Sequence, residues 1–169
     1  ELGEWFGTRR WLVQLVLWLV IINGMIAFLL FIVPAVDPAG FAAEGVPAMD
    51  IMGLTTFFSF ITLAGAIGII ILMQDEVIQE KQTGTAAWIL TKPVSRPAFI
   101  LSKWVSNMTG ALIFIVALPS IVALVEVFLA VPGGTPILPF LAGVGAVILL
   151  IAFYASLVIL LGVLFEQRG

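Results

Sequence analysis

The sequence contains no cysteine and no histidine, and charged residues make up only 10% of its 169 positions. Without these two residue types the chain cannot form a disulfide, a thiol nucleophile, an imidazole base or a Cys/His zinc site. Seven Lys and Arg against ten Asp and Glu give a net charge of −3, which leaves no basic patch for phosphates. The sequence therefore predicts no catalytic group, no metal site and no cofactor of its own, and no nucleic-acid partner.

Apolar residues make up most of the chain. Hydrophobic residues account for 62% of the chain, and its mean hydropathy is +1.24. A soluble globular domain carries about a quarter charged residues, so this chain lacks the polar surface that a soluble domain needs. The lipid bilayer is therefore the expected solvent and partner of most of its surface.

Four runs with few or no charged residues are long enough to cross a bilayer, whose core of about 30 Å needs roughly 20 helical residues. The first is too long for the apolar region of a signal peptide. The predicted fold is an all-α integral membrane protein with one transmembrane domain, residues 1–169. The predicted spans are about 11–33, 51–73, 104–130 and 137–165.

Basic residues predict the orientation of these spans. All seven Lys and Arg lie before the first span, between the second and third, or after the fourth, whereas the connections 34–50 and 131–136 have none. Because short loops rich in Lys and Arg stay in the cytoplasm, both ends of the segment are expected to be cytoplasmic, in a multi-pass protein of the cell membrane. The chain begins with Glu1 and stops at Gly169 directly after a span, so we expect a fragment of a longer protein.

The cytoplasmic connection 74–103 carries the signals of a helix, a turn, a short helix, a turn and another helix. Gly84 can end a helix that continues the second span, since glycine adopts left-handed backbone angles. Thr85 suits the N-cap of a short helix, which Pro93 stops. Pro97 suits the first turn of a new helix that leads into the third span. We therefore expect a short helix on the cytoplasmic side, between the second and third spans.

This short helix presents an apolar face made of Trp88, Ile89 and Leu90. An exposed apolar face of this kind needs a surface to bury against, either lipid headgroups or another protein. The simpler alternative is a solvated connector in which glycine and proline only mark turns.

The string E-K-Q-T-G-T-A-A-W-I-L-T-K-P-V-S-R, residues 80–96, resembles the intracellular loop of ABC-2 type transporter permeases. In that family an acidic residue, a Gly-Thr pair, a run of Leu-like residues, Pro-Val and Ser-Arg recur in this order. The E-L-x-E-x-x-x-x-R-R approach to the first span is also similar, so the resemblance covers nearly the whole chain. Such permeases usually have six spans, and the last two are expected to be missing here.

The resemblance implies a membrane subunit of an ATP-driven exporter, which forms the translocation path and is not itself an enzyme. Its partners would be an ABC-type ATP-binding subunit, which binds ATP and Mg, and a second permease copy in a homo- or heterodimer. This chain has no phosphate-binding G-x-x-x-x-G-K motif of its own. The residues expected to couple to the ATP-binding subunit are Glu80, Gly84, Thr85, Trp88, Ile89, Leu90, Pro93 and Arg96. Drugs, antibiotics, lipids, ions and polysaccharides are all compatible substrates.

Four residues inside the spans are candidates for a translocation path or for contacts between helices: Asn23, Asn107, Pro119 and Glu126. Polar side chains in spans more often link helices than line a path. Pro119 is expected to kink the third span, as a hinge or as a static bend. Glu126 lies close to the outer end of that span, either as an ion site or as a carboxylate that reaches interfacial water.

Two other functions fit the same residues. A four-span homo-oligomeric carrier driven by an ion gradient would need a titratable site, and Glu126 is its candidate. A membrane anchor or assembly protein without transport activity would need only the cytoplasmic helix as a docking site.

Overall fold

The computed structural model describes residues 10–44, 46–73, 95–131 and 136–164. Within these ranges the chain is almost entirely helical and contains no strand. Four of its helical segments are long and apolar enough to cross a membrane. The prediction of an all-α protein with four transmembrane helices is therefore confirmed, while the predicted short helix after Thr85 lies outside the described residues.

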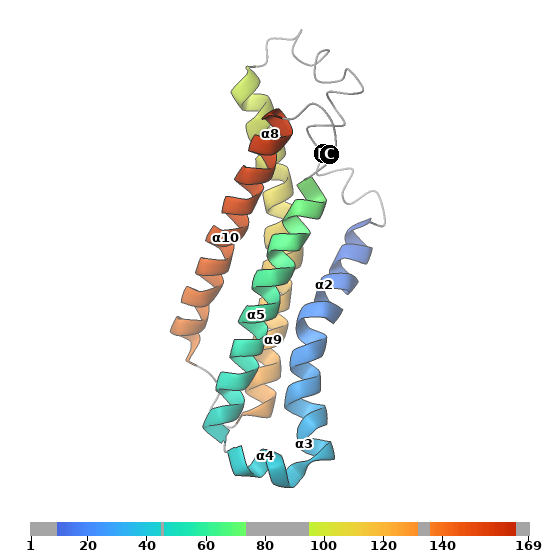
Figure 1. The fold of residues 1–169 in the computed structure, drawn as a ribbon, viewed down its shortest axis with the longest axis vertical. Helices are drawn as coiled ribbons and strands as arrows, with labels where there is room; N and C mark the ends of the chain where they lie inside the picture. Colours follow the sequence, from blue (N-terminus) through green and yellow to red (C-terminus); the bar gives the residue numbers. More distant parts are fainter. Residues whose placement is uncertain (1–9, 45, 74–94, 132–135, 165–169) are drawn as a thin grey trace.

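Two of the four spans are built from consecutive helical segments that follow one another without a break (Figure 1). The first span and the third span each contain a π-helix, labelled η. In chain order the elements are α2 (Arg10–Ala27), η1 (Phe28–Ile32), α3 (Val33–Val36), α4 (Pro38–Glu44), α5 (Val46–Met73), α8 (Arg96–Ala111), η2 (Leu112–Ala117), α9 (Leu118–Ala130) and α10 (Ile137–Leu164).

Helix α5 lies at the centre of the bundle. It runs between α2 on one side and α10 on the other, and the third span packs behind it (Figure 1). The short helix α4 crosses one end of the bundle between α3 and α5. This arrangement gives the second span more helix neighbours than a peripheral span has.

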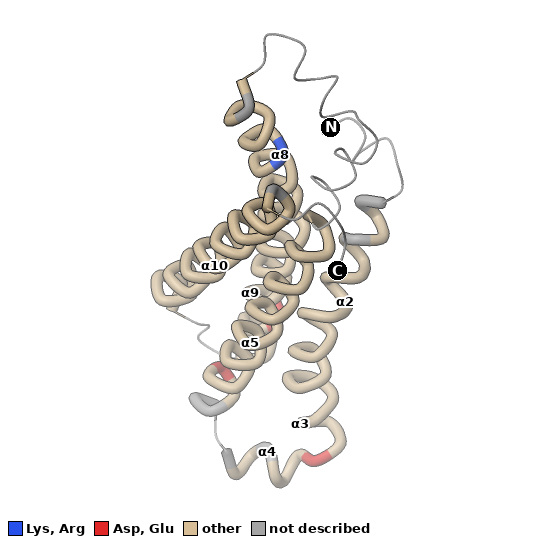
Figure 2. The backbone as a smooth tube through the Cα atoms, turned by 45° about the horizontal axis from the view of Figure 1, so that its top comes forward, with Lys and Arg blue, Asp and Glu red and all other residues tan. Residues whose placement is uncertain are grey.

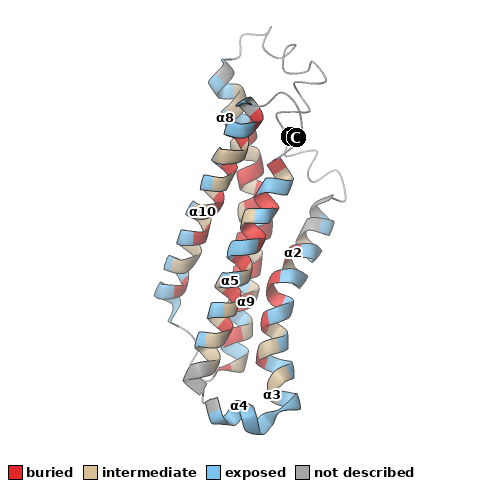
Figure 3. Cartoon of the chain, in the orientation of Figure 1, coloured by how far each residue is buried: buried red, intermediate tan, exposed pale blue. Residues whose placement is uncertain are grey.

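Buried residues recur every three or four positions along each span, as expected for helices that pack along one face. On α10 the buried residues Val147, Ile151, Ala155 and Ile159 are four apart. The opposite faces are exposed (Figure 3), and their large exposed residues include Leu, Ile, Val and Phe. Lipid chains would cover these outward faces.

Two glycines allow α5 to lie close to its neighbours. A Cβ atom on Gly68 would stand 2.7 Å from Trp18 Cζ2 and 2.8 Å from Ile115 Cδ1. A Cβ atom on Gly65 would stand 2.8 Å from Ile151 Cδ1. Since lipid is as apolar as these side chains, close packing of this kind is a main source of helix association in a membrane.

The outer connection predicted at 34–50 contains α3, α4 and the start of α5, which the sequence pattern did not predict. Pro34 lies in α3, which continues the first span without a break. Asp37 separates the two short helices, and its Oδ1 accepts a hydrogen bond of 3.0 Å from the Gly40 backbone N–H. The capping Asp37, followed by Pro38, thus starts α4 in a stretch too short to span a membrane.

The described charges are separated along the bundle (Figure 2). Lys103 lies on α8, near one end. Asp37 and Asp50 lie at the opposite end, and Glu126 is in the last turns of α9. The separation agrees with the distribution of basic residues in the sequence.

Candidate functional site

The third span begins at the last residues of the connection between the second and third spans. Ser95 is the N-cap of α8, and its Oγ accepts a hydrogen bond of 3.4 Å from the Ala98 backbone N–H. Pro97 lies in the first turn, as the sequence predicted. The helix then runs from Arg96 through η2 and α9 to Ala130. The other residues expected to couple to a partner, Glu80 to Pro93, lie outside the described residues.

The first turns of α8 are tied to α10. Trp104 Nε1 donates a hydrogen bond of 3.2 Å to Ser156 Oγ, which in turn donates to the Ala152 carbonyl at 2.8 Å. The neighbouring Lys103 is only 6% exposed. Movement of this end of the third span would therefore also move the fourth span.

A polar cluster links the first and third spans at the proline of the third span; it consists of Asn23, Pro119, Ser120 and Glu126. Asn23 Nδ2 donates a hydrogen bond of 2.9 Å to the Pro119 carbonyl, and Asn23 is only 4% exposed. The Asn23 side chain also lies close to the carboxyl group of Glu126. Asn23 of α2 thus meets two positions on α9.

The polar cluster retains unused hydrogen-bonding capacity. Asn23 Oδ1, Ser120 Oγ and Glu126 Oε2 are buried and have no hydrogen-bond partner among the described residues. Directly before it, η2 replaces the α-helical pattern, and the Leu118 N–H bonds the Ile113 carbonyl, five residues back. π-Helical segments of this kind often occur at functional sites.

The remaining candidate in the spans, Asn107, lies apart from this cluster. Its Nδ2 donates to the Lys103 carbonyl at 3.2 Å, in its own helix. Thr109 likewise donates to the Val105 carbonyl at 2.7 Å. Of the four candidates, the structure brings together Asn23, Pro119 and Glu126.

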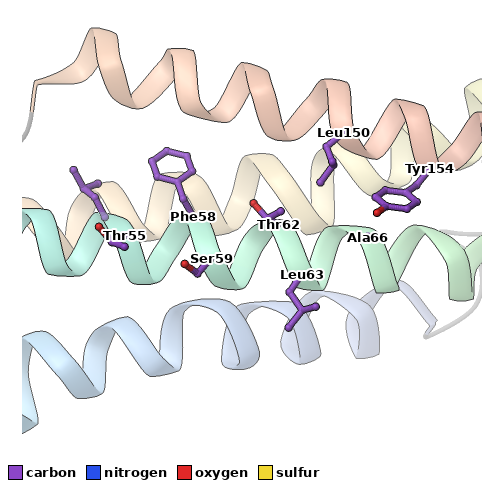
Figure 4. Close-up of a pocket in the computed structure, with 9 residues that line it drawn as sticks. Thr55, Phe58, Ser59, Thr62, Leu63, Ala66, Leu150 and Tyr154 are labelled. Carbon is purple, nitrogen blue, oxygen red and sulfur yellow. The ribbon is translucent and has the colours of Figure 1, made fainter.

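A groove of about 690 Å³ lies between α5 and α10, and the sequence analysis missed it (Figure 4). Phe58 and Thr62 of α5 point toward α10, while Leu150 and Tyr154 of α10 point back. Three hydroxyl residues at four- and three-residue spacing in an otherwise apolar span were the signal that could have revealed it. The groove is lined by Leu54, Thr55, Phe58, Ser59, Thr62, Leu63, Ala66, Leu150 and Tyr154.

An aromatic cluster of α5 and α10 includes Phe58 of this groove. The Phe58 ring centroid lies 5.1 Å from that of Phe57 and 5.7 Å from that of Phe140, and Phe57 also stacks on Phe140 at 5.6 Å. Contacts of this geometry favour a fixed position for each ring. The groove therefore combines an aromatic side chain held in place with a row of hydroxyl groups along its length.

No group of three or more metal-ligating side chains occurs in the part of the chain that the structure describes. The polar cluster offers one carboxylate, one amide and one hydroxyl, and the groove offers only hydroxyls. These residue types can bind and orient a ligand.

Comparison with known proteins identifies the family. No curated protein and no solved structure gives a significant match. The family model described as ABC-2 family transporter protein matches residues 7–168, almost the full length of the chain. The chain therefore belongs to the ABC-2 transporter family, and its four apolar helices are those of a membrane-spanning permease.

Proposed function

We propose that this permease is the translocation subunit of an ATP-driven exporter that works with a separate ATP-binding subunit. The family match over residues 7–168 carries the proposal. The docking element would be the short helix in the connection 74–103, where Trp88, Ile89 and Leu90 supply an apolar face. Glu80, Gly84, Thr85, Pro93 and Arg96 would shape this element and hold it in place.

The third span is suited to transmit movement of that connection. It begins at the cap Ser95 and continues without a break to Ala130. Near its start Trp104 is bonded to α10, and further along Pro119 is bonded to α2. A displacement of the docking element would therefore reach both neighbouring spans through one continuous helix.

The proposed cycle is alternating access. Two ATP-binding subunits, with ATP and Mg bound between them, close and open, and each moves one docking element. Two permease copies, identical or different, would rock and open a central path to the outside of the cell membrane. Both termini of the segment would lie in the cytoplasm, as the basic residues predict.

Co-purification from membranes tests the coupling. The full-length wild-type permease is expected to retain an ATP-binding subunit in detergent, and Trp88→Asp is expected to lose it, because a carboxylate would be buried in an apolar contact. Gln82→Asp is the matched control, since it adds the same charge to the same connection outside the apolar face. Retention by Trp88→Asp, or equal loss in both variants, would contradict the proposed docking.

An ion-driven carrier is the second candidate, because Glu126 is a partly buried carboxyl group next to two further unpartnered oxygens. Glu126→Gln separates the two functions. Glutamine keeps the size and polarity of the side chain beside Asn23, so an ATP-driven permease should keep its export activity. Loss of export at normal expression would favour the carrier, in which the carboxylate itself is needed. An anchor without transport activity would show no substrate-dependent phenotype in either variant.

A further inference from the structure

We infer that the groove between α5 and α10 binds uncharged, lipid-soluble molecules that carry hydroxyl, ester or amide groups. This inference rests on the proposed function, because it names the substrate class that such a permease would take up. It is independent of the polar cluster, which joins α2 to α9.

Hydroxyl groups line the groove along one strip of α5. Thr55, Ser59 and Thr62 are four and three residues apart, so they lie on the same side of the helix. All three are exposed on the surface of the bundle. The span that contains them runs from Met49 to Met73, so Thr62 lies near its middle. At that depth water is absent, and a hydroxyl group must find its partner in a protein or in a dissolved molecule.

Three other hydroxyl groups of the described spans behave differently. Ser102, Thr109 and Ser156 each donate to a backbone carbonyl three or four residues earlier in their own helix. Within the described ranges, no such bond is made by the three hydroxyls of the groove. They are therefore available to a ligand, and leaving them unpaired in hydrocarbon is unfavourable.

The groove selects against charge. None of its nine lining residues is Lys, Arg, Asp or Glu. A charged group near the middle of a bilayer costs at least about 2.5 kcal/mol without a partner. A ligand that satisfies the hydroxyl strip must therefore be polar and uncharged.

The dimensions favour a small molecule over a transmembrane helix. A volume of about 690 Å³ is typical of ligand sites. The strip of small side chains from Thr55 to Ala66 covers about 16 Å of helix rise. Beyond it, the large exposed side chains of Ile51 and Ile70 occupy the same side of α5. A helix that spans the bilayer would clash with these side chains, whereas a molecule about half as long as the bilayer is thick fits between them.

The ligand would enter from the bilayer. The groove is open along the outer side of α5, where Leu63 is 61% exposed. Molecules already dissolved in lipid reach such a surface by lateral diffusion, without crossing a headgroup barrier. Phe58, which packs against Phe57 and Phe140, forms part of the wall that they would contact.

Photolabelling of the full-length protein in lipid nanodiscs tests the inference. The probe is a diacylglycerol with a diazirine in one acyl chain, which is uncharged and carries one hydroxyl and two ester groups. We expect labelled peptides from the facing sides of α5 and α10, with unlabelled diacylglycerol as competitor. A photoreactive fatty acid, ionised at pH 8, should label these peptides far less.

Two variants probe the groove itself. Ala66→Phe fills the groove, and the double variant Ser59→Ala with Thr62→Val removes two hydroxyls at nearly constant volume. Each variant should lower labelling roughly threefold to tenfold, which corresponds to the free energy of one or two hydrogen bonds in a membrane. Ala117→Phe is the matched control, because Ala117 is an exposed position of η2 outside the groove. Labelling in this variant should equal that of the wild type.

Three results would overturn the inference. The first is uniform labelling of all lipid-facing helices, and the second is equal labelling by the fatty acid. The third is efficient disulfide formation between two copies of Ser59→Cys, which would mean that a helix occupies the groove. The 169 residues contain no cysteine, so Ser59→Cys places a single thiol in this segment. Labelling is measured without the ATP-binding subunit, so a failure of the proposed coupling and a failure of ligand binding give separate results.

Discussion

At the scale of single residues, Gly68 sets the distance between α5 and its neighbours. Gly68→Ala places a Cβ atom 2.7 Å from the Trp18 ring, and overpacking of this kind costs about 1–3 kcal/mol. Gly24→Ala is the control, since nothing lies within 4 Å of its added Cβ atom. That change should be neutral, or stabilising by up to about 1 kcal/mol. Thermal unfolding in detergent measures both, and equal shifts would contradict the packing described.

The proximity of Asn23 and Glu126 makes a second prediction at this scale. Asn23→Leu and Glu126→Met each remove one partner, so their effects on stability should be coupled by about 0.5–2 kcal/mol. A double-mutant cycle in detergent measures this coupling. Asn23→Leu combined with Asn107→Leu is the control, because Asn107 bonds its own helix and the two effects should add. Additive effects of the first pair would show that the two side chains do not act together.

At the scale of the element, the capped start of α8 joins the connection after the second span to the third span. Ser95→Ala removes the acceptor of the Ala98 N–H and should loosen the first turn by about 0.5–2 kcal/mol. Amide hydrogen exchange of the peptide that contains Ala98 should then be faster. Ser102→Ala, which removes an exposed hydroxyl one turn further on, should leave that exchange unchanged. Slow exchange in Ser95→Ala would mean that Pro97 and packing hold the turn without the cap.

The same element shows what local sequence predicts well and what it does not. Ser95 followed by Pro97 is a local signal, and the helix begins where that signal places it. The bond from Asn23 to the Pro119 carbonyl joins residues 96 positions apart, and sequence could offer Asn23 only as one of several candidates. Local capping and turn chemistry act between neighbouring residues, whereas the choice of partner depends on how the spans pack.

At the scale of the whole molecule, hydropathy predicted the four spans because a bilayer imposes both length and composition on a helix. It did not predict α4, since seven residues that start with proline give no periodic pattern to detect. It also missed the groove, because Leu150 and Tyr154 are ordinary span residues until α10 brings them against α5. The close approach of Gly68 to Trp18 and Ile115 likewise depends on how the spans pack.

The charges also predict how the whole molecule is oriented in the membrane. Lys103 lies at the α8 end of the bundle, and the helix α4, which follows Asp37, lies at the other (Figure 2). Short segments with basic residues stay in the cytoplasm, so a cysteine placed on α4 should face outward and one at the start of α8 inward. Ala39→Cys and Ala98→Cys are a matched pair, since both alanines are exposed and the chain has no cysteine of its own.

A membrane-impermeant maleimide applied to intact cells should therefore label Ala39→Cys, and it should label Ala98→Cys only after the membrane is permeabilised. The reverse pattern would place the docking connection outside the cell, where no ATP-binding subunit could reach it. That result would contradict both the orientation and the ATP-driven mechanism. Labelling of Ala39→Cys alone in intact cells would place the docking connection in the cytoplasm, where an ATP-binding subunit has access to ATP.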